Sequence, residues 1–380
     1  MCYNCRVDYR AQWREKRRRE RRLRLLVPIA VLAMGVAGAL TLPHERPRAT
    51  LKWESAPVRS VGPPHLASSG DVLVVARPDG AFLGLDAATG AARWPEERFV
   101  PLGGRTVAVG AGRAFVAGGD GAVRAFWQSD GRPAWSEPLS VAEGVSAPLL
   151  YADDTLYVAS EAGAVIAAKA ETGEVIWRND EGAAPVVAGM AFGDGRLYVA
   201  ALDGKARALS AENGQVAWKA PSRDSRRESF GMVYSDLVLT DGALSFGSDD
   251  GWVYVLASED GVLRSAFRAR APVRSRAAVE AGAAYFASCD GVFRKVGLHG
   301  GEAVWEYASG VPATCPPALV GRFVCFGADD GRVYGLDKLT GECEWTWRCG
   351  AAIKSLLAVG GDAVVCATWD GSLHALRTPR

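Results

Sequence analysis

The segments GLDAATGAARW, at residues 84–94, and GLDKLTGECEW, at residues 335–345, share Gly, Asp, Thr, Gly and Trp at the same positions. The spacing of the last glycine and the tryptophan, Gly-x-x-x-Trp, recurs in six segments, which predicts that one structural unit is repeated along the chain. The tryptophans of these segments are Trp94, Trp135, Trp177, Trp218, Trp305 and Trp345. Each indole removes roughly 200 Å² from water when buried, so we expect these side chains to dock neighbouring units together rather than to bind a ligand.

A second glycine lies ten residues before the glycine of the Gly-x-x-x-Trp pattern and marks an earlier turn. Eight units contain this earlier turn, and in seven of them its sequence is Asp-Gly. Its glycines are Gly80, Gly121, Gly163, Gly204, Gly251, Gly291, Gly331 and Gly371, at spacings of 40 to 47 residues. Asp-Gly between alternating segments favours a tight hairpin turn, because both turn positions readily adopt positive φ. We therefore predict that each unit forms four antiparallel strands and that the last strand ends in Trp. Such a four-stranded unit is one blade of a β-propeller.

The two ends of the chain indicate how the propeller closes. The eighth unit stops at Arg380, before its outer strand, while residues 50–54 (TLKWE) contain an additional tryptophan, Trp53. We predict that this segment supplies the missing strand and removes two exposed sheet edges. The predicted fold class is therefore all-β: an eight-bladed, monomeric β-propeller of four-stranded antiparallel blades over residues 50–380.

The D-x-x-T-G-x-x-x-W pattern at residues 86–94 and 337–345 resembles the tryptophan-docking motif of the PQQ-like repeat family. The resemblance covers the chain from about residue 50 to its end, and the family includes quinoprotein dehydrogenases, sensor domains and protein-binding scaffolds. An exported eight-bladed chain of this length is most similar to the propeller lipoproteins of the outer-membrane β-barrel assembly machine. The sequence departs from them in having no lipid-acceptor Cys after its apolar segment, and unit five carries Ser265 at the Trp position.

The first 49 residues predict membrane targeting. Residues 1–24 form a basic tail with a net charge of +7, and residues 25–42 (LLVPIAVLAMGVAGALTL) contain no charged residue. As a helix this apolar segment would span roughly 27 Å, so we expect a signal anchor that leaves the tail in the cytoplasm and the propeller in the periplasm or another extracytoplasmic space. The alternative is a signal peptide cleaved near Ala37 and Ala39, which would release an exported protein. Residues 43–49 are interpreted as a linker.

Composition and motifs argue against nucleic-acid binding and catalysis. Beyond residue 24 the net charge is −6, which is unfavourable for neutralising phosphates. The Cys-Cys pair that the family resemblance would imply for a quinone enzyme does not occur, and turn formation explains the repeated Asp residues. No His has a partner at metal-ligand spacing. We predict no catalytic residue, no metal and no cofactor; PQQ is suggested by the resemblance alone.

The propeller region contains six cysteines, all in its last three units. Cys325 and Cys366 occupy corresponding strands with opposite parity, so their side chains would point towards each other across a blade interface. A disulfide between them is therefore considered. The alternative is that these thiols are free and buried, because stacked sheets lie about 10 Å apart and a disulfide needs Cα atoms within about 7 Å.

Two successive connections between units are rich in arginine. The longest spacing marks an insertion at residues 219–229 (KAPSRDSRRES), and the corresponding connection one unit later carries four more arginines. The arginines of the two connections are Arg223, Arg226, Arg227, Arg268, Arg270, Arg274 and Arg276. Both connections run to the same rim of a propeller, where arginines can bind an acidic protein segment. The alternative is a solvated surface that nearby carboxylates neutralise.

These features predict a non-enzymatic, extracytoplasmic protein-binding scaffold that uses its rim loops, in cell-envelope or outer-membrane protein assembly. The alternative function, implied by the family resemblance, is a PQQ- or small-ligand-binding sensor or a protein similar to quinoprotein dehydrogenases.

Overall fold

The computed structural model describes residues 48–55, 64–101, 103–182, 184–222 and 227–379. The predicted basic tail and apolar segment, and most of the linker, lie outside these ranges. No helix within the ranges is long and apolar enough to cross a lipid bilayer.

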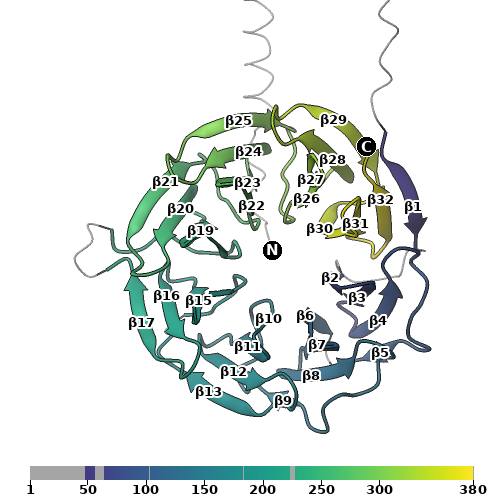
Figure 1. Ribbon diagram of the computed structural model, residues 1–380, viewed down its shortest axis with the longest axis vertical. Helices are drawn as coiled ribbons and strands as arrows, with labels where there is room; N and C mark the ends of the chain where they lie inside the picture. Colours follow the sequence, from purple (N-terminus) through teal and green to yellow (C-terminus); the bar gives the residue numbers. More distant parts are fainter. Residues whose placement is uncertain (1–47, 56–63, 102, 183, 223–226, 380) are drawn as a thin grey trace, which may run out of the picture. The chain divides into compact units, whose positions relative to one another are not determined.

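The described residues form eight four-stranded antiparallel sheets, which are the blades of a propeller (Figure 1). The first four blades contain β2 (His65–Ser69), β3 (Val72–Ala76), β4 (Ala81–Asp86) and β5 (Arg98–Phe99); β6 (Gly104–Gly110), β7 (Arg113–Gly118), β8 (Ala122–Trp127) and β9 (Leu139–Ser140); β10 (Leu150–Ala152), β11 (Thr155–Ala159), β12 (Val165–Lys169) and β13 (Val175–Asn179); and β14 (Ala191–Gly193), β15 (Arg196–Ala200), β16 (Ala206–Ser210) and β17 (Val216–Ala220).

The remaining blades contain β18 (Val238–Thr240), β19 (Ala243–Gly247), β20 (Trp252–Ala257) and β21 (Leu263–Arg268); β22 (Ala278–Glu280), β23 (Ala283–Ser288), β24 (Val292–Gly297) and β25 (Ala303–Ala308); β26 (Ala318–Val320), β27 (Phe323–Gly327), β28 (Arg332–Asp337) and β29 (Cys343–Arg348); and β30 (Ile353–Val359), β31 (Ala363–Thr368), β32 (Leu373–Arg377) and β1 (Thr50–Glu54). The predicted all-β fold of eight four-stranded blades is confirmed.

The eighth blade joins the two ends of the chain. β1 pairs antiparallel with β32, from Thr50 opposite Arg377 to Glu54 opposite His374. Figure 1 shows β1, in purple, alongside β32, in yellow. The strand around Trp53 therefore completes the blade whose outer position the C-terminal segment leaves empty.

The central strands of each blade are buried on both faces, because every blade packs between two others. Phe82 of blade one lies 4.6 Å from Phe126 of blade two, and Phe293 of blade six lies 4.5 Å from Phe326 of blade seven, measured between ring centroids. This explains why these strands are continuous apolar runs rather than alternating ones.

The repeated tryptophans join neighbouring blades by hydrogen bonds as well as by packing. Six indole Nε1 atoms donate to a backbone carbonyl at the outer turn of the next blade. The donor and acceptor residues are Trp53 and Ala87 (3.2 Å), Trp94 and Gln128 (2.9 Å), Trp135 and Ala170 (3.0 Å), Trp177 and Ala211 (2.8 Å), Trp218 and Ser258 (2.9 Å), and Trp305 and Lys338 (3.2 Å). In blade five, the Ser265 hydroxyl donates to the Leu298 carbonyl over 2.6 Å in place of an indole.

Contrary to the prediction from the sequence, the tryptophans do not end the outer strands. Trp177, for example, lies in the middle of β13, which continues to Asn179 opposite Val165. The strand extends past the indole because its backbone still has the third strand beside it to pair with. In blades one and two the outer strand is only two residues long, and Trp94 and Trp135 precede it.

Candidate functional site

The candidate site is centred on the turn at residues 249–251 (Asp-Asp-Gly), which joins β19 and β20 in blade five. We call the surface around it the blade-five rim, made up of this turn together with Arg227, Met232, Tyr234, Trp252, Arg268, Arg270, Arg274 and Arg276. Two connections meet at the turn: the one between β17 and β18, and the one between β21 and β22.

Arg227 reaches the turn from the first connection. Its Nη1 donates to the Tyr254 hydroxyl over 2.6 Å and lies 3.6 Å from Asp250 Oδ2, while its guanidinium lies 5.0 Å from the centre of the Tyr254 ring. The Tyr254 hydroxyl donates to Asp250. Burial, together with this bond to Asp250, raises the pKa of Tyr254, so its hydroxyl stays protonated. The network positions Arg227 over the turn.

Arg274 reaches the same turn from the second connection. Its Nε and Nη2 each donate to a different oxygen of Asp249 over 2.7 Å, which is the paired geometry that arginine favours with a carboxylate. Its guanidinium also lies 5.2 Å from the centre of the Tyr234 ring. Arg227 and Arg274, 47 residues apart in the sequence, are therefore held on adjacent carboxylates of one turn.

Three more of the predicted arginines are exposed on this part of the chain: Arg268, Arg270 and Arg276. Arg268 lies opposite Trp252 in the β20–β21 pair, with its guanidinium 5.9 Å from the indole. Within the described ranges, neither Arg268 nor Arg270 makes an ion pair with a carboxylate. Arg223 and Arg226 lie outside the described residues.

Arg276 interacts with Asp236, a buried carboxyl group of the first connection. Burial raises the pKa of Asp236, whereas a hydrogen bond from the Gly189 backbone N–H, 2.6 Å long, and the charge of Arg276 oppose that rise. Two of the predicted arginines, Arg227 and Arg274, thus pair with the turn, and Arg276 offsets a buried acid.

The sequence analysis did not identify the apolar members of the rim. Met232 and Tyr234 are 47% and 38% exposed. Their connection is anchored at Phe230, which is buried against Phe246 and Tyr254, and by a backbone bond from Asp249 N–H to the Met232 carbonyl. One feature of the sequence indicates an apolar surface at this turn. In unit five the residue after the Asp-Gly turn is Trp252, whereas the other units carry smaller or charged residues at this position.

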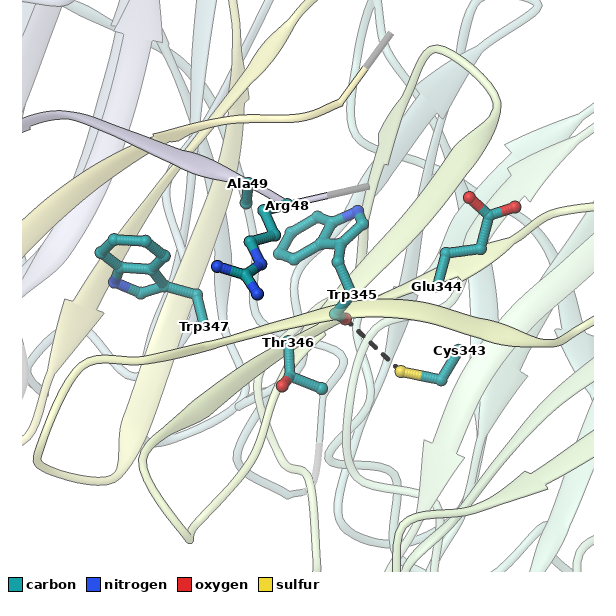
Figure 2. Close-up of a pocket in the computed structure, with 7 residues that line it drawn as sticks. All are labelled: Arg48, Ala49, Cys343, Glu344, Trp345, Thr346 and Trp347. Atoms are coloured by element: carbon teal, nitrogen blue, oxygen red, sulfur yellow. Dashed lines mark hydrogen bonds between the residues drawn. The ribbon is translucent and has the colours of Figure 1, made fainter. Parts of the chain in front are cut away.

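A cavity of about 320 Å³ lies elsewhere, along β29 where residues 48 and 49 enter the propeller. Figure 2 shows the Arg48 side chain between the indoles of Trp345 and Trp347. Because a side chain of the protein itself occupies the space between these rings, we assign no ligand to the cavity.

The cysteines and possible metal ligands complete the survey. The Cys325 and Cys366 thiols are not bonded to each other, so the structure does not contain the disulfide considered from the sequence. The sulfur beside Cys366 belongs instead to Cys349, at 3.4 Å, because the segment that crosses from blade seven to blade eight carries Cys349 towards β31. In the part of the chain that the structure describes, no group of three or more His, Cys, Asp or Glu side chains is arranged to hold a metal ion.

Comparison with solved structures shows the same fold at low sequence identity. The computationally designed Ika8 protein matches with a TM-score of 0.73 and 17% identity, covering 86% of this chain and 99% of that one. BamB from Moraxella catarrhalis matches with a TM-score of 0.70 and 17% identity, covering 87% and 99%. Sqt1 from Saccharomyces cerevisiae matches with a TM-score of 0.75 and 12% identity, covering 88% and 98%.

Comparison with curated protein sequences gave no match. A family model, in contrast, matches three stretches of the chain, residues 44–149, 138–280 and 289–378, and its description is outer membrane protein assembly factor BamB. These stretches cover most of the propeller, so the chain belongs to the family of the outer membrane protein assembly factor BamB.

Proposed function

We propose that this protein is a non-enzymatic scaffold that binds an acidic segment of a partner protein at the blade-five rim and acts in assembly of the cell envelope. Membership of the BamB family and the eight-bladed fold support a protein-binding role. The observation that carries the choice of surface is the pair Arg268 and Arg270, two exposed cations without an ion pair inside the described part of the chain.

The rim combines the side chains that protein interfaces favour. Arg, Tyr and Met are enriched at interface centres, where an apolar anchor is surrounded by groups that form directed hydrogen bonds. Here Met232 and Tyr234 provide exposed apolar surface, and Arg268 and Arg270 provide charge. Arg227 and Arg274 are already oriented by Asp250 and Asp249, which reduces the entropy lost on binding. The partner segment would therefore be acidic and carry an apolar residue.

The charge contribution can be tested with the double variant Arg268→Glu/Arg270→Glu. A partner is first captured from crosslinked membranes, then purified, and its dissociation constant is measured by calorimetry. We expect a loss of affinity of about 100-fold or more, since two charge-assisted hydrogen bonds are removed and each contributes about 1.5–3 kcal/mol. We also expect wild-type binding to weaken as salt concentration rises.

The matched control is Arg264→Glu, on the same outer strand β21 and also exposed, but four residues from Arg268 and so roughly 13 Å along the strand. It should bind as the wild type does. Equal affinity of the rim variant and the wild type, or equal loss in the control, would exclude the blade-five rim as the docking surface.

We also propose that the propeller lies outside the cytoplasm, attached to the membrane by residues 25–42 or released after cleavage. The basic tail followed by an uncharged segment supports this orientation. Alkaline phosphatase fused after Arg380 should be active in cells, because its disulfides form only in an oxidising compartment. An inactive, intact fusion would place the propeller in the cytoplasm instead.

A further inference from the structure

Two cysteines meet at the interface between blades seven and eight. Cys349 follows β29 in the segment that crosses to β30, and Cys366 lies in β31. Their sulfur atoms are 3.4 Å apart. An S–S bond is about 2.05 Å long, so the two atoms need to approach by roughly 1.4 Å, a distance that rotation of one side chain can supply.

The backbone holds both residues in place. The Cys349 N–H donates to the Gly331 carbonyl over 2.8 Å, which fixes it to the Asp-Gly turn of blade seven. Cys366 lies in β31, a middle strand of blade eight, opposite Leu356 of β30 and His374 of β32, and is fully buried. The partly exposed Cys349 is therefore the sulfur that can move, and the one that a reagent reaches first.

The neighbouring cysteines are directed elsewhere. The Cys315 thiol donates to the Gly327 carbonyl over 3.3 Å, and the Cys343 thiol to the Trp345 carbonyl over 3.4 Å. Cys325 is fully buried in β27, a middle strand of blade seven. Among these side chains, Cys349 is the one whose sulfur contacts Cys366.

We infer that Cys349 and Cys366 are a site of disulfide formation that joins blade seven to blade eight when the protein meets a small-molecule disulfide such as oxidised glutathione. The inference does not depend on the proposed docking function.

The reaction proceeds by two thiol–disulfide exchanges. The Cys349 thiolate attacks one sulfur of the oxidant, whose S–S bond breaks and releases one thiol, which takes up the proton that Cys349 lost. Cys366 then loses its proton to solvent and attacks the Cys349 sulfur, releasing the second thiol. Two cysteine thiols are oxidised, and one disulfide of the oxidant is reduced to two thiols. The contact with the Cys349 thiol and burial both raise the pKa of Cys366. Burial still acts once Cys349 is in the mixed disulfide, so the second exchange should accelerate as pH rises.

The bond would reinforce the part of the ring where the chain ends meet. Blade eight combines the continuous C-terminal strands β30 to β32 with β1 from the other end of the chain. A covalent link to blade seven limits the separation of these blades in the unfolded state, so the oxidised protein should unfold at a higher urea concentration than the reduced protein.

Peptide mapping tests the inference directly on the full chain. The protein is incubated with oxidised glutathione, its remaining thiols are alkylated at acidic pH, and it is digested with trypsin without reduction. Cleavage at Lys and Arg places each propeller cysteine in a different peptide, with Cys349 in residues 349–354 and Cys366 in residues 355–377. The expected result is that these two peptides are joined, as the dominant linked species, and separate on reduction.

Two variants complete the test. Cys349→Ser should lose the linked peptide and the shift in urea midpoint between oxidised and reduced protein, whereas Cys343→Ser, at the start of β29, should retain both. Alkylation of both Cys349 and Cys366 after oxidation, or a dominant link between Cys366 and Cys325, would overturn the inference. Because Cys349 is partly exposed, its replacement by Ser is expected to leave the fold intact.

Discussion

The repeated motif is explained residue by residue at residues 84–94. Asp86 accepts hydrogen bonds from the Thr89 N–H and hydroxyl, at 2.9 and 2.8 Å, which closes the turn and lowers the pKa of Asp86. Gly90 has φ of +71°, and a Cβ there would lie 2.5 Å from the Trp53 ring. At Gly84 a Cβ would lie 2.4 Å from the Trp94 ring. Gly90 thus makes space for the indole of Trp53 in blade eight, and Gly84 for the indole of Trp94 in its own blade.

Trp345 differs from the other docking tryptophans in its hydrogen bonding. Its Nε1 is buried and has no partner among the described residues, whereas Trp177 Nε1 donates to the Ala211 carbonyl. Trp345→Phe should therefore lower the free energy of unfolding by about 1 kcal/mol less than Trp177→Phe, because one hydrogen bond fewer is lost. Urea titration of both variants measures the difference. An equal loss of unfolding free energy in the two variants would indicate that the Trp345 Nε1–H donates to a hydrogen-bond acceptor in solution.

At the scale of elements, the pair β1 and β32 holds the ring closed and contains a titratable contact. His374 Nδ1 lies 3.4 Å from Glu54 Oε1 across the two strands, and His374 Nε2 is buried without a partner inside the described ranges. Burial lowers the pKa of His374, although the charges of Glu54 and Asp370 act in the opposite direction.

The stability of this strand pair should depend on pH. Below the ordinary histidine pKa of 6.5, the unfolded chain binds a proton that the folded chain resists, so the free energy of unfolding should fall as pH decreases from 7 towards 5. His374→Leu removes this contribution and should flatten the curve in that window. Chemical denaturation at several pH values measures both proteins, and identical slopes would show that His374 is not the group responsible.

For the molecule as a whole, each blade of the described ring packs between two others, so the stability of each blade depends on both of its neighbours. Trp53 of β1 bonds to Ala87 in blade one, and β1 itself pairs with β32 of blade eight. This short N-terminal strand therefore acts at two interfaces at once.

Removal of β1 should expose the edge of β32 and promote self-association through that edge. A chain that lacks residues 1–55 is expected to form dimers or larger species in size-exclusion chromatography with light scattering. A chain that lacks residues 1–47 retains β1 and serves as the control, expected to remain monomeric. A monomeric, stably folded chain without β1 would contradict the proposed importance of closure.

The repeat, the number of blades and the strand that completes the last one could be predicted from the amino-acid sequence. These follow from local chemistry, since the Asp-Gly turns and the tryptophans recur at fixed spacing and residues 50–54 carry an additional tryptophan of the same kind. The contacts between side chains that are distant in the sequence could not be predicted in this way, because they arise from how the blades pack. Arg227 and Arg274 reach Asp250 and Asp249 because two connections converge on one turn, and Cys366 meets Cys349 rather than Cys325 because the crossing segment lies nearer than the facing strand. Such contacts depend on how neighbouring blades pack, and periodicity along the chain does not specify that packing.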